Sequence, residues 1–388
     1  MQIDAGAGGQ IFKFLFQRQR FHPVCSCRLA FSTDSLAHGG AREETWRGKR
    51  RLRLGFTFRG EVVTFCGASF FRQPVRFPFE PPREREFDAV GFGLNAVDHL
   101  VVVSAYPQFD TKVRLVEHAR AAGGQTATTL TGLQRLGMKT AYAGRFGSDD
   151  AGRFGLEELR AEGVDVERAE VVEGARNQIA FIVIDARTGE RTIMWDRDER
   201  LTYQEYEAPR NFAARGRVLH MDAHDPRACA RLAREARAAS TVVTVDVDNI
   251  YDGLEELLPH VDVLVSSKEF PRRLTGIDDE RAALVAAKSL LRADAIVGMT
   301  VGERGAVVYH EGVFVESPAF AVPGGCRDTT GAGDAFHAGF LHGLLRGEEI
   351  EGCLRIACAV AALKCRSLGA RTALPTPREL ERLLAGEG

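Results

Sequence analysis

From residue 87 to the C-terminus, short apolar runs alternate with longer segments in which apolar residues recur at a helical period. The apolar runs are Ala89–Gly93, Thr140–Gly144, Val218–Met221, Val242–Val247, Val261–Val265 and Ala295–Val301. The segments of helical period are Thr126–Leu136, Ala151–Glu162, Pro226–Ala238, Glu280–Arg292, Asp334–Leu345 and Ile350–Cys365. Almost continuously apolar strands separated by amphipathic helices are typical of a parallel sheet covered on both faces. The pattern therefore predicts a three-layer α/β/α fold with a mostly parallel central sheet.

Two stretches break this alternation, because strand-like runs follow one another there without a helix between them. Leu100–Val103 is followed by Val113–His118, and Gln178–Ile184 is followed by Arg191–Trp195. The intervening residues 185–189, Asp-Ala-Arg-Thr-Gly, fit the tight turn of a hairpin. These insertions, at about 100–118 and 178–195, predict a small β-sheet lid over the carboxyl ends of the main strands, where ligands bind in open α/β folds.

The first 86 residues show no sustained period of 2 or 3.6. They hold 12 of the 24 phenylalanines and a net charge of +7, whereas the remainder carries −9. The stretch Pro74–Pro82 is too rich in proline for a regular element. Three interpretations of this segment compete: a basic arm, an organelle-targeting segment, or an upstream region that is translated because the assigned start is too early. We favour the third, although the next methionine is Met138 and a true start would then need a non-Met codon. We expect residues 1–86 to be a disordered extension or a misassigned start, and residues 87–388 to form the folded domain.

Composition and charge exclude several classes of protein. Hydrophobic residues make up 45% and charged residues 27%, which is typical of a globular protein. No apolar run approaches the roughly 20 residues that span a bilayer, and the acidic body lacks a basic footprint for nucleic acid. The eight cysteines form no C-x-x-C pair and no zinc-like spacing, and no secretory cleavage site is present. We therefore expect a cytoplasmic protein without a membrane or nucleic-acid partner.

The densest chemical signal is the segment 328–340, Asp-Thr-Thr-Gly-Ala-Gly-Asp-Ala-Phe-His-Ala-Gly-Phe. Gly331, Ala332 and Gly333 lead into a predicted helix, so curled backbone N–H groups and the helix dipole can bind an anion such as a transferring phosphoryl group. Asp334, in the first turn, is placed to accept the proton of an attacking hydroxyl. The dipole should keep Asp334 ionised and a weak base, which loose phosphoryl transfer tolerates. The alternative is that Asp334 only caps the helix.

No Gly-Lys-Ser/Thr follows this loop, so it is not a Walker A loop, and the protein-kinase motifs are also missing. The segment instead resembles the signature of the PfkB (ribokinase-like) family of carbohydrate kinases. Other segments resemble that family in order and spacing: Gly91–Asp98, Ala122–Gln125 with Leu133–Gly137, Tyr142–Gly152, Thr300–Gly305, and Ala359–Cys365 with Gly369–Pro375. The resemblance runs from about Phe87 to the C-terminus. It implies ATP-dependent phosphorylation of a hydroxyl on a small sugar or sugar derivative.

The resemblance also implies a role for each matching residue. The base would be Asp334, with the γ-phosphate held by Gly331, Ala332 and Gly333. Substrate hydroxyls would be bound by Asp98, Gly123, Gly124 and Gln125. ATP would lie along Thr300, Gly302, Gly305 and Thr330. A potassium-type ion would be held by Asp328 and the loop Gly369–Ala373, and Glu269 is the candidate ligand for the Mg²⁺ that accompanies ATP. Lid sheets in this family can pair between subunits, which implies a homodimer through the lid.

The chain departs from the family pattern in three features, at position 125, at position 128 and over residues 267–270. The signature usually has Asn after the paired glycines and again three positions later, where this chain has Gln125 and Thr128. The usual N-x-x-E near metal and phosphates is replaced by Ser-Lys-Glu-Phe at 267–270, which leaves the usual magnesium arrangement open.

Gln125 and the run Ala361–Cys365 look most like a branch that includes ketohexokinase and sulfofructose kinase, which favours a ketose or a ketose phosphate as substrate. Lys112, Arg114 and Arg191 on the lid strands are candidates for binding an anionic substrate group. A solvated strand face explains these three cations at least as well.

Two other functions stay open. One is a nucleoside kinase of the same fold, and the other is a sugar-binding regulatory protein that has lost phosphoryl transfer. The intact segment 330–334 favours activity, whereas the missing N-x-x-E pattern argues against it.

Further polar residues have simpler interpretations. His220, Asp222, His224 and Asp225 follow a predicted strand, and a pocket edge is favoured there over a metal site. Asp246 and Asp248 end the next strand and are candidates for the pocket rim in the same way. Asp149 and Asp150 precede a predicted helix, which we expect them to cap.

Overall fold

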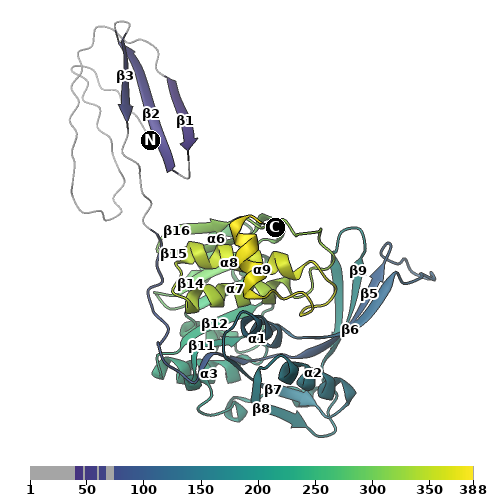
Figure 1. Ribbon diagram of the computed structural model, residues 1–388. Helices are drawn as coiled ribbons and strands as arrows, with labels where there is room; N and C mark the ends of the chain where they lie inside the picture. The colour runs from purple at the N-terminus through teal and green to yellow at the C-terminus, as the bar shows by residue number, and fades with distance from the viewer. Residues whose placement is uncertain (1–39, 47–48, 59–60, 67–73, 388) are drawn as a thin grey trace. The chain divides into compact units, whose positions relative to one another are not determined.

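The chain is divided into two compact units, Met1–Gln73 and Pro74–Gly388. The computed structural model describes residues 40–46, 49–58, 61–66 and 74–387 (Figure 1). In the first unit, strands β1 (Gly40–Trp46), β2 (Lys49–Phe58) and β3 (Glu61–Cys66) form an antiparallel sheet in that order. These strands lie where we expected no regular element.

The strand β2 carries a sequence signal that explains this difference. Leu52, Leu54, Phe56 and Phe58 occupy every second position, which is the period of a strand. The prediction of disorder for the rest of 1–73 falls outside the described residues. That 1–73 comes from a misassigned start stays a hypothesis.

The second unit begins before Phe87. Val75, Phe77 and Phe79 pack against the apolar core, and the ring of Phe77 meets that of Phe340 edge-on, with centroids 5.9 Å apart. The backbone N–H of Ile350 also donates to the carbonyl oxygen of Val75 at 3.2 Å. The boundary that we predicted at residue 86 is therefore corrected to Gln73, because alternating apolar side chains hold this proline-rich stretch on the core.

A nine-stranded sheet forms the centre of the second unit, in the order β16-β15-β14-β13-β12-β11-β4-β7-β8. Its strands are β4 (Phe87–Phe92), β7 (Thr140–Gly147), β8 (Asp165–Val172), β11 (Gly216–Met221), β12 (Val242–Val247), β13 (Val263–Ser267), β14 (Ile296–Thr300), β15 (Ala306–His310) and β16 (Val313–Ser317). Neighbours from β8 to β14 pair in parallel, and β14, β15 and β16 pair antiparallel. The prediction of a mostly parallel sheet is confirmed, with β8 and the β15–β16 hairpin added at its edges.

Helices cover both faces of this sheet (Figure 1). On one face, α3 (Pro226–Ala238), α4 (Leu254–Leu257), α5 (Glu269–Thr275) and α6 (Glu280–Lys288) share an apolar core with the sheet. On the other face lie α1 (Gln125–Arg135), α2 (Asp150–Ala161), α7 (Ala332–Leu345) and α8 (Ile350–Lys364). Helix α9 (Pro377–Ala385) packs on α8 and shares an apolar cluster with Leu136 and Ala335. This is the three-layer α/β/α fold that the sequence predicted.

A second, four-stranded sheet has the order β10-β9-β5-β6 and forms the lid. Its strands are β5 (Ala96–Val103), β6 (Glu117–Gly123), β9 (Ile179–Asp185) and β10 (Arg191–Asp196). The two predicted antiparallel pairs are present, and a parallel β5–β9 ladder joins them. Strand β6 begins at Glu117 and not at Val113, and the apolar side chains of Val113, Leu115 and Val116 before it are exposed.

The corrected boundary predicts different outcomes for two truncations. A chain that begins at Pro74 should unfold within about 2 °C of the full chain, because it keeps the whole second unit. A chain that begins at Phe87 loses Val75, Phe77 and Phe79, so its Tm should fall by roughly 5–10 °C. Thermal unfolding followed by circular dichroism measures both. Equal Tm values for the two truncations would contradict the boundary.

Candidate active site

The carboxyl ends of the parallel strands meet the start of α7. Asp222 follows β11, Asp246 lies at the end of β12, and Thr300 ends β14. On α7, His337 Nε2 lies 3.3 Å from Asp246 Oδ1 and ties the first turns of this helix to the end of β12. Because ligands of open α/β folds bind at this edge, the glycine-rich loop lies where the fold predicts a site.

The glycine-rich loop packs closely against Ala370 at Gly331 and is open at Gly333. Gly331 adopts φ 77° as the N-cap residue of α7, and a Cβ there would come within 2.7 Å of the Ala370 side chain. A Cβ on Gly333 would meet no heavy atom within 4 Å, so space lies above the first turn. The first N–H groups of a helix have no intrahelical acceptors, and this open space gives an anion access to them.

Asp334 stands in the first turn of α7 beside that space and is half-buried. Burial raises the pKa of Asp334 well above its ordinary value; Asp246 and Asp98 raise it further, and Arg191 and Arg371 oppose them. We had expected the helix dipole to keep this carboxyl a weak base. Desolvation and like charges outweigh the dipole, so Asp334 is a stronger base than predicted.

The alternative role of Asp334 as a helix cap has no support in this geometry. The N-cap residue of α7 is Gly331, and no side-chain hydrogen bond caps that helix. Asp149 offers the contrast, because its carboxylate accepts a hydrogen bond from the Gly152 N–H at 3.0 Å and caps α2. The predicted capping of α2 is confirmed for Asp149.

The predicted sugar-binding residues meet where β5, β6 and α1 adjoin. Asp98 on β5 is 5% exposed, and burial raises its pKa to about 6, with Arg371 opposing. A Cβ on Gly123 would lie 2.2 Å from Asp98 Oδ2, so only glycine lets the carboxyl lie there. Gly124 has φ 91° and precedes α1, and a Cβ on it would collide with the backbone of Asn95. These side chains and glycines form one wall of the site.

Gln125, the first residue of α1, faces a buried carboxylate. Its Nε2 donates to Asp246 Oδ2 at 3.5 Å, while His337 approaches the other oxygen. Burial disfavours the charged form of Asp246, yet the neighbouring His337, His220 and Gln125 lower its pKa overall. Asp246, which sequence placed only at the pocket rim, is therefore a buried ionised group beside the predicted substrate residue.

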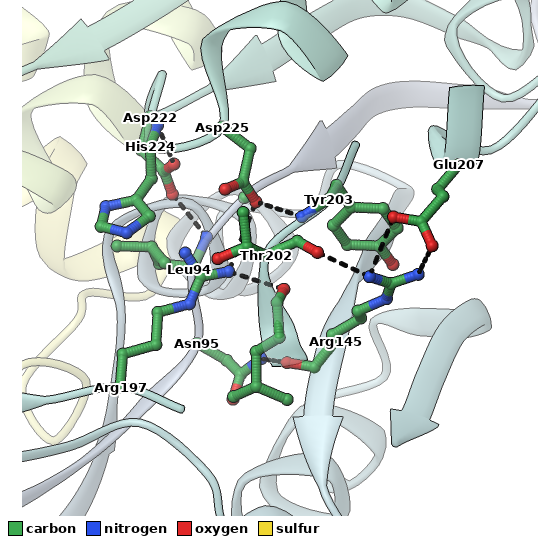
Figure 2. Close-up of polar contacts among 12 residues, drawn as sticks. Leu94, Asn95, Arg145, Arg197, Thr202, Tyr203, Glu207, Asp222, His224 and Asp225 are labelled. Carbon is green, nitrogen blue, oxygen red and sulfur yellow. Dashed lines mark hydrogen bonds and ion pairs between the residues drawn. The ribbon is translucent and has the colours of Figure 1, made fainter. Parts of the chain in front are cut away.

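The carboxylates after β11 hold backbone segments: Asp222 fixes the segment after β4, and Asp225 fixes the loop 197–207 (Figure 2). Asp222 Oδ2 accepts from the Leu94 N–H at 2.5 Å and from Thr126 Oγ1 at 2.8 Å. Asp225 Oδ2 accepts from the Tyr203 N–H at 3.2 Å and pairs with Arg197 at 3.3 Å. Within the residues that the structure describes, no three His, Cys, Asp or Glu side chains lie together in a group that could hold a metal ion.

An aromatic edge lies beside these carboxylates. The ring of His224 is 5.0 Å from that of Tyr251 and 6.1 Å from that of Trp195, which comes from lid strand β10. The Tyr251 hydroxyl donates to Asp248 Oδ1 at 3.4 Å, and burial raises the pKa of Asp248 to about 6. The rim therefore offers ring faces together with hydrogen-bonding carboxyl groups, a combination suited to a polyhydroxylated ring.

The predicted nucleotide residues lie at two places. Thr300 ends β14, and Gly302 follows in a 3₁₀ turn at φ 60°, where a Cβ would meet nothing within 4 Å. Gly305 has φ 96°, and a Cβ there would lie 2.0 Å from the Ser317 carbonyl oxygen, so its role is structural. Thr330 is in the glycine-rich loop, and its buried hydroxyl has no hydrogen-bond partner within the described residues.

Arg371 is a site residue that the sequence did not single out. Its side chain is buried, Nε donates to Thr128 Oγ1 at 3.3 Å, and Nη2 donates to the Gly123 carbonyl oxygen. Burial lowers the pKa of Arg371 to about 10, while Asp98 and other acidic groups oppose that change. Thr128, where the family usually has Asn, is thus the acceptor for this arginine. The only sequence signal was the position of Arg371 inside the predicted 369–373 loop.

Arg191 reaches the glycine-rich loop from the lid. Its Nη1 donates to Thr329 Oγ1 at 2.8 Å, and that hydroxyl lies 3.2 Å from the Gly189 carbonyl oxygen, to which it donates. Arg191 also lowers the pKa of Asp334. Of the three lid cations considered, this one is held at the site, so the lid strand β10 and the anion loop are linked by a charged side chain.

The two metal candidates fit their ions poorly. Glu269 begins α5 with a carboxylate 3.3 Å from Arg272, and Phe270, at the position of the usual Glu, is fully buried in the apolar core. Asp328 is fully buried, and the Lys364 ammonium lies 3.7 Å from its Oδ2. Burial lowers the pKa of Lys364, and the charge of Asp328 opposes that change. A further cation beside Asp328 would meet this lysine.

A three-layer α/β/α fold with a lid sheet, an open helix start and a carboxyl of raised pKa beside it is the arrangement that a small-molecule kinase needs. The chain belongs to the pfkB family of carbohydrate kinases, whose model matches residues 93–377. The predicted ribokinase-like fold and the enzyme class are thereby confirmed, and ATP is the phosphoryl donor expected throughout this family.

Individual relatives differ in the substrates that their names give. A nucleoside kinase of Methanocaldococcus jannaschii is 26% identical over 299 residues, covering 75% of this chain and 95% of the relative. The ketohexokinase of Mus musculus is 24% identical over 282 residues, covering 70% and 94%. The structure of Arabidopsis thaliana ribokinase complexed with ribose and ATP superposes with a TM-score of 0.64 at 21% identity, covering 79% of this chain and 99% of that one. This last likeness concerns the fold alone.

Replacing Arg191 tests the link between lid and loop. Arg191→Ala should lower kcat/KM on the order of 10²-fold, the usual scale for losing one preorganised electrostatic group. Removing a positive charge disfavours the carboxylate form of Asp334, so the acid limb of the pH profile should move to higher pH. Arg187→Ala is the matched control, because Arg187 lies in the same hairpin and pairs with Asp185. If Arg191→Ala keeps the parent rate and its acid limb does not move, Arg191 does not assist the loop or Asp334.

Proposed function

We propose that the protein transfers the γ-phosphoryl group of ATP to a hydroxyl of a small sugar, with Asp334 as the general base. The observation that carries this proposal is the half-buried Asp334 carboxyl with a raised pKa, placed beside the open start of α7. The carboxylate accepts the hydroxyl proton, the substrate oxygen bonds to the γ-phosphorus, and the bond to the bridging oxygen breaks to release ADP. Gly331, Ala332 and Gly333 line the anion position, with Thr330 next to them.

The substrate side supports a neutral polyhydroxylated ring. Asp98, Gln125 and Asp246 supply hydrogen-bonding groups, and Trp195, His224 and Tyr251 supply ring faces. We favour a ketose, in keeping with Gln125 and the similarity to ketohexokinase. The carboxyl groups around the site make a ketose phosphate less favourable, because they would repel its phosphate. A nucleoside is the second candidate, supported by the same ring faces and by the archaeal nucleoside kinase.

ATP brings its divalent metal, which we propose to be Mg²⁺. When bound, this ion neutralises charge on the β- and γ-phosphates. Glu269 is the candidate from sequence, and holding the ion would require it to release Arg272. Asp334 acts on the acceptor side of the transferring phosphoryl group, at the substrate hydroxyl, whereas the metal acts on the phosphates of ATP.

We also propose that the protein works in a reducing cytoplasm. Cys229, Cys326, Cys353, Cys358 and Cys365 are free thiols, and all but Cys326 are buried. Of the helices in the described part of the chain, none combines the length and hydropathy that a bilayer crossing needs.

The outer face of the lid supports a homodimer as the assembly. Phe181 on β9 faces Met194 on β10 and stacks on His99 of β5, and Phe181 and Met194 are 48% and 53% exposed. The opposite face buries Leu100, Ile182 and Ile184. Exposed apolar side chains on a β-sheet are a typical contact surface between subunits.

Light scattering after size exclusion tests this assembly. The parent should elute as a dimer, and Phe181→Asp with Met194→Asp should convert it to a monomer, because burying two carboxylates at a contact is unfavourable. The matched control changes the exposed Val285 and Leu290 to Asp and should leave the mass unchanged. A monomeric parent would exclude the lid dimer.

The decisive test of the function combines a substrate panel with one substitution. ADP release is measured with ketoses, ketose phosphates, ribose and nucleosides in the presence of MgATP. Asp334→Asn should lower the rate on the best substrate by about 10²–10⁴-fold. Its affinity for ATP should hold or increase, since a negative charge near the γ-phosphate is gone.

Asp149→Asn is the matched control for that substitution. It also removes a carboxylate at the start of a helix, but from the N-cap position, where Asn serves as well, so its rate should stay within about twofold. If Asp334→Asn keeps the parent rate, the proposed mechanism is wrong. If no sugar or nucleoside supports ADP release by the parent, the sugar-binding regulatory protein becomes the better description.

A further inference from the structure

The carboxylate of Asp328 lies at the junction of three segments. Its Oδ1 accepts a hydrogen bond from the Thr330 N–H, and its Oδ2 accepts one from the Gly369 N–H, each at 2.8 Å. The first bond fixes the start of the glycine-rich loop, and the second fixes the loop after α8. Asp328 has no exposed surface, so its charge needs a partner inside the protein.

Lys364, at the end of α8, supplies that partner. Its side chain is also without exposed surface. Nζ donates to the carbonyl oxygen of Asp328 at 2.8 Å and lies 3.7 Å from the carboxylate Oδ2. The ammonium thus contacts both a main-chain oxygen and a carboxylate oxygen of one residue, which are the oxygen types that would surround a monovalent cation.

A potassium-type ion does not fit beside these groups. An ion held by Asp328 and the 369–373 loop would lie close to the Lys364 ammonium, and because neither side chain is exposed, bulk solvent would not screen the two positive charges. The Asp328 carboxylate already has the Lys364 ammonium as its buried counter-ion. The residues present therefore disagree with the ion site that resemblance to the family implies.

We propose that the Lys364 ammonium takes the place of a monovalent metal ion at Asp328, so that this kinase works without K⁺. Lys364 acts as a positioning residue. It holds Asp328, and through the Thr330 N–H it holds the loop that carries Gly331, Gly333 and Asp334. The cation is covalently part of α8, so the loop keeps its shape whatever the salt.

The parent protein provides the first test. Turnover on the best substrate is measured in KCl and in tetramethylammonium chloride at equal ionic strength, with all other alkali ions removed. The two rates should agree within about twofold, because no site is left for the ion. Activation by K⁺ of tenfold or more would overturn the proposal. This comparison needs no variant, so it holds even if changes at position 364 prevent folding.

The second test removes the ammonium and offers an ion in its place. Lys364→Met should be at least tenfold less active in tetramethylammonium, and K⁺ or NH₄⁺ should restore much of that loss, whereas Li⁺ should not. The control is Lys288→Met, because Lys288 Nζ also donates to two carbonyl oxygens, of Arg292 and Ala293, but on α6. This control should remain indifferent to K⁺.

A substrate-free measurement separates this proposal from the proposed function. K⁺ at fixed ionic strength should raise the Tm of Lys364→Met and leave the Tm of the parent and of Lys288→Met unchanged. That result would support the ion replacement even if no sugar is phosphorylated. A folded Lys364→Met whose activity and Tm ignore K⁺ would show that the position is structural only, and the proposal would fall.

Discussion

The close packing of α7 on α8 is the constraint on which the site depends. A Cβ on Gly339 would lie 2.7 Å from the Cα of Ala357, and one on Gly343 would lie 3.0 Å from the Cα of Cys353. Only glycine permits this approach of two backbones. The rest of α7 from Ala335 onward is buried, so the helix has one position over the sheet edge. The anion loop at its start is held in place by the core rather than by the loop itself.

The same packing sets the electrostatics. With α7 fixed, Asp334 lies among Asp98 and Asp246, and these like charges together with burial raise its pKa. Arg191 from the lid and Arg371 from the loop after α8 oppose that rise. The end of α8 brings Lys364 to Asp328, the residue that begins the loop. The pKa of the Asp334 carboxyl is thus set by its burial and by charges from the sheet edge, the lid and the C-terminal loop.

The contacts of Thr128, Phe270 and Gln125 explain why these residues can replace the ones usual in the family. Thr128 is short, and it accepts from the buried Arg371, whose guanidinium extends to Gly123. Phe270 belongs to the apolar core, so this position has no ligand to offer a metal. Gln125 is longer than the usual Asn, and its amide contacts the Asp246 carboxylate. The changes at positions 125 and 128 act through partners more than 100 residues away in the chain.

The sequence by itself determined the layer order, the six main strands, six of the covering helices and the loop 328–340, because periodicity and glycine spacing are local properties of the chain. It missed β8, the β15–β16 hairpin and the start of the second unit at Pro74, where weak or proline-rich patterns are held by contacts with distant residues. Only the tertiary structure decided that Arg371 enters the site, that Asp334 has a raised pKa and that Lys364 stands at Asp328. Those features depend on burial and on charges summed over segments far apart in sequence, and no local pattern records such sums.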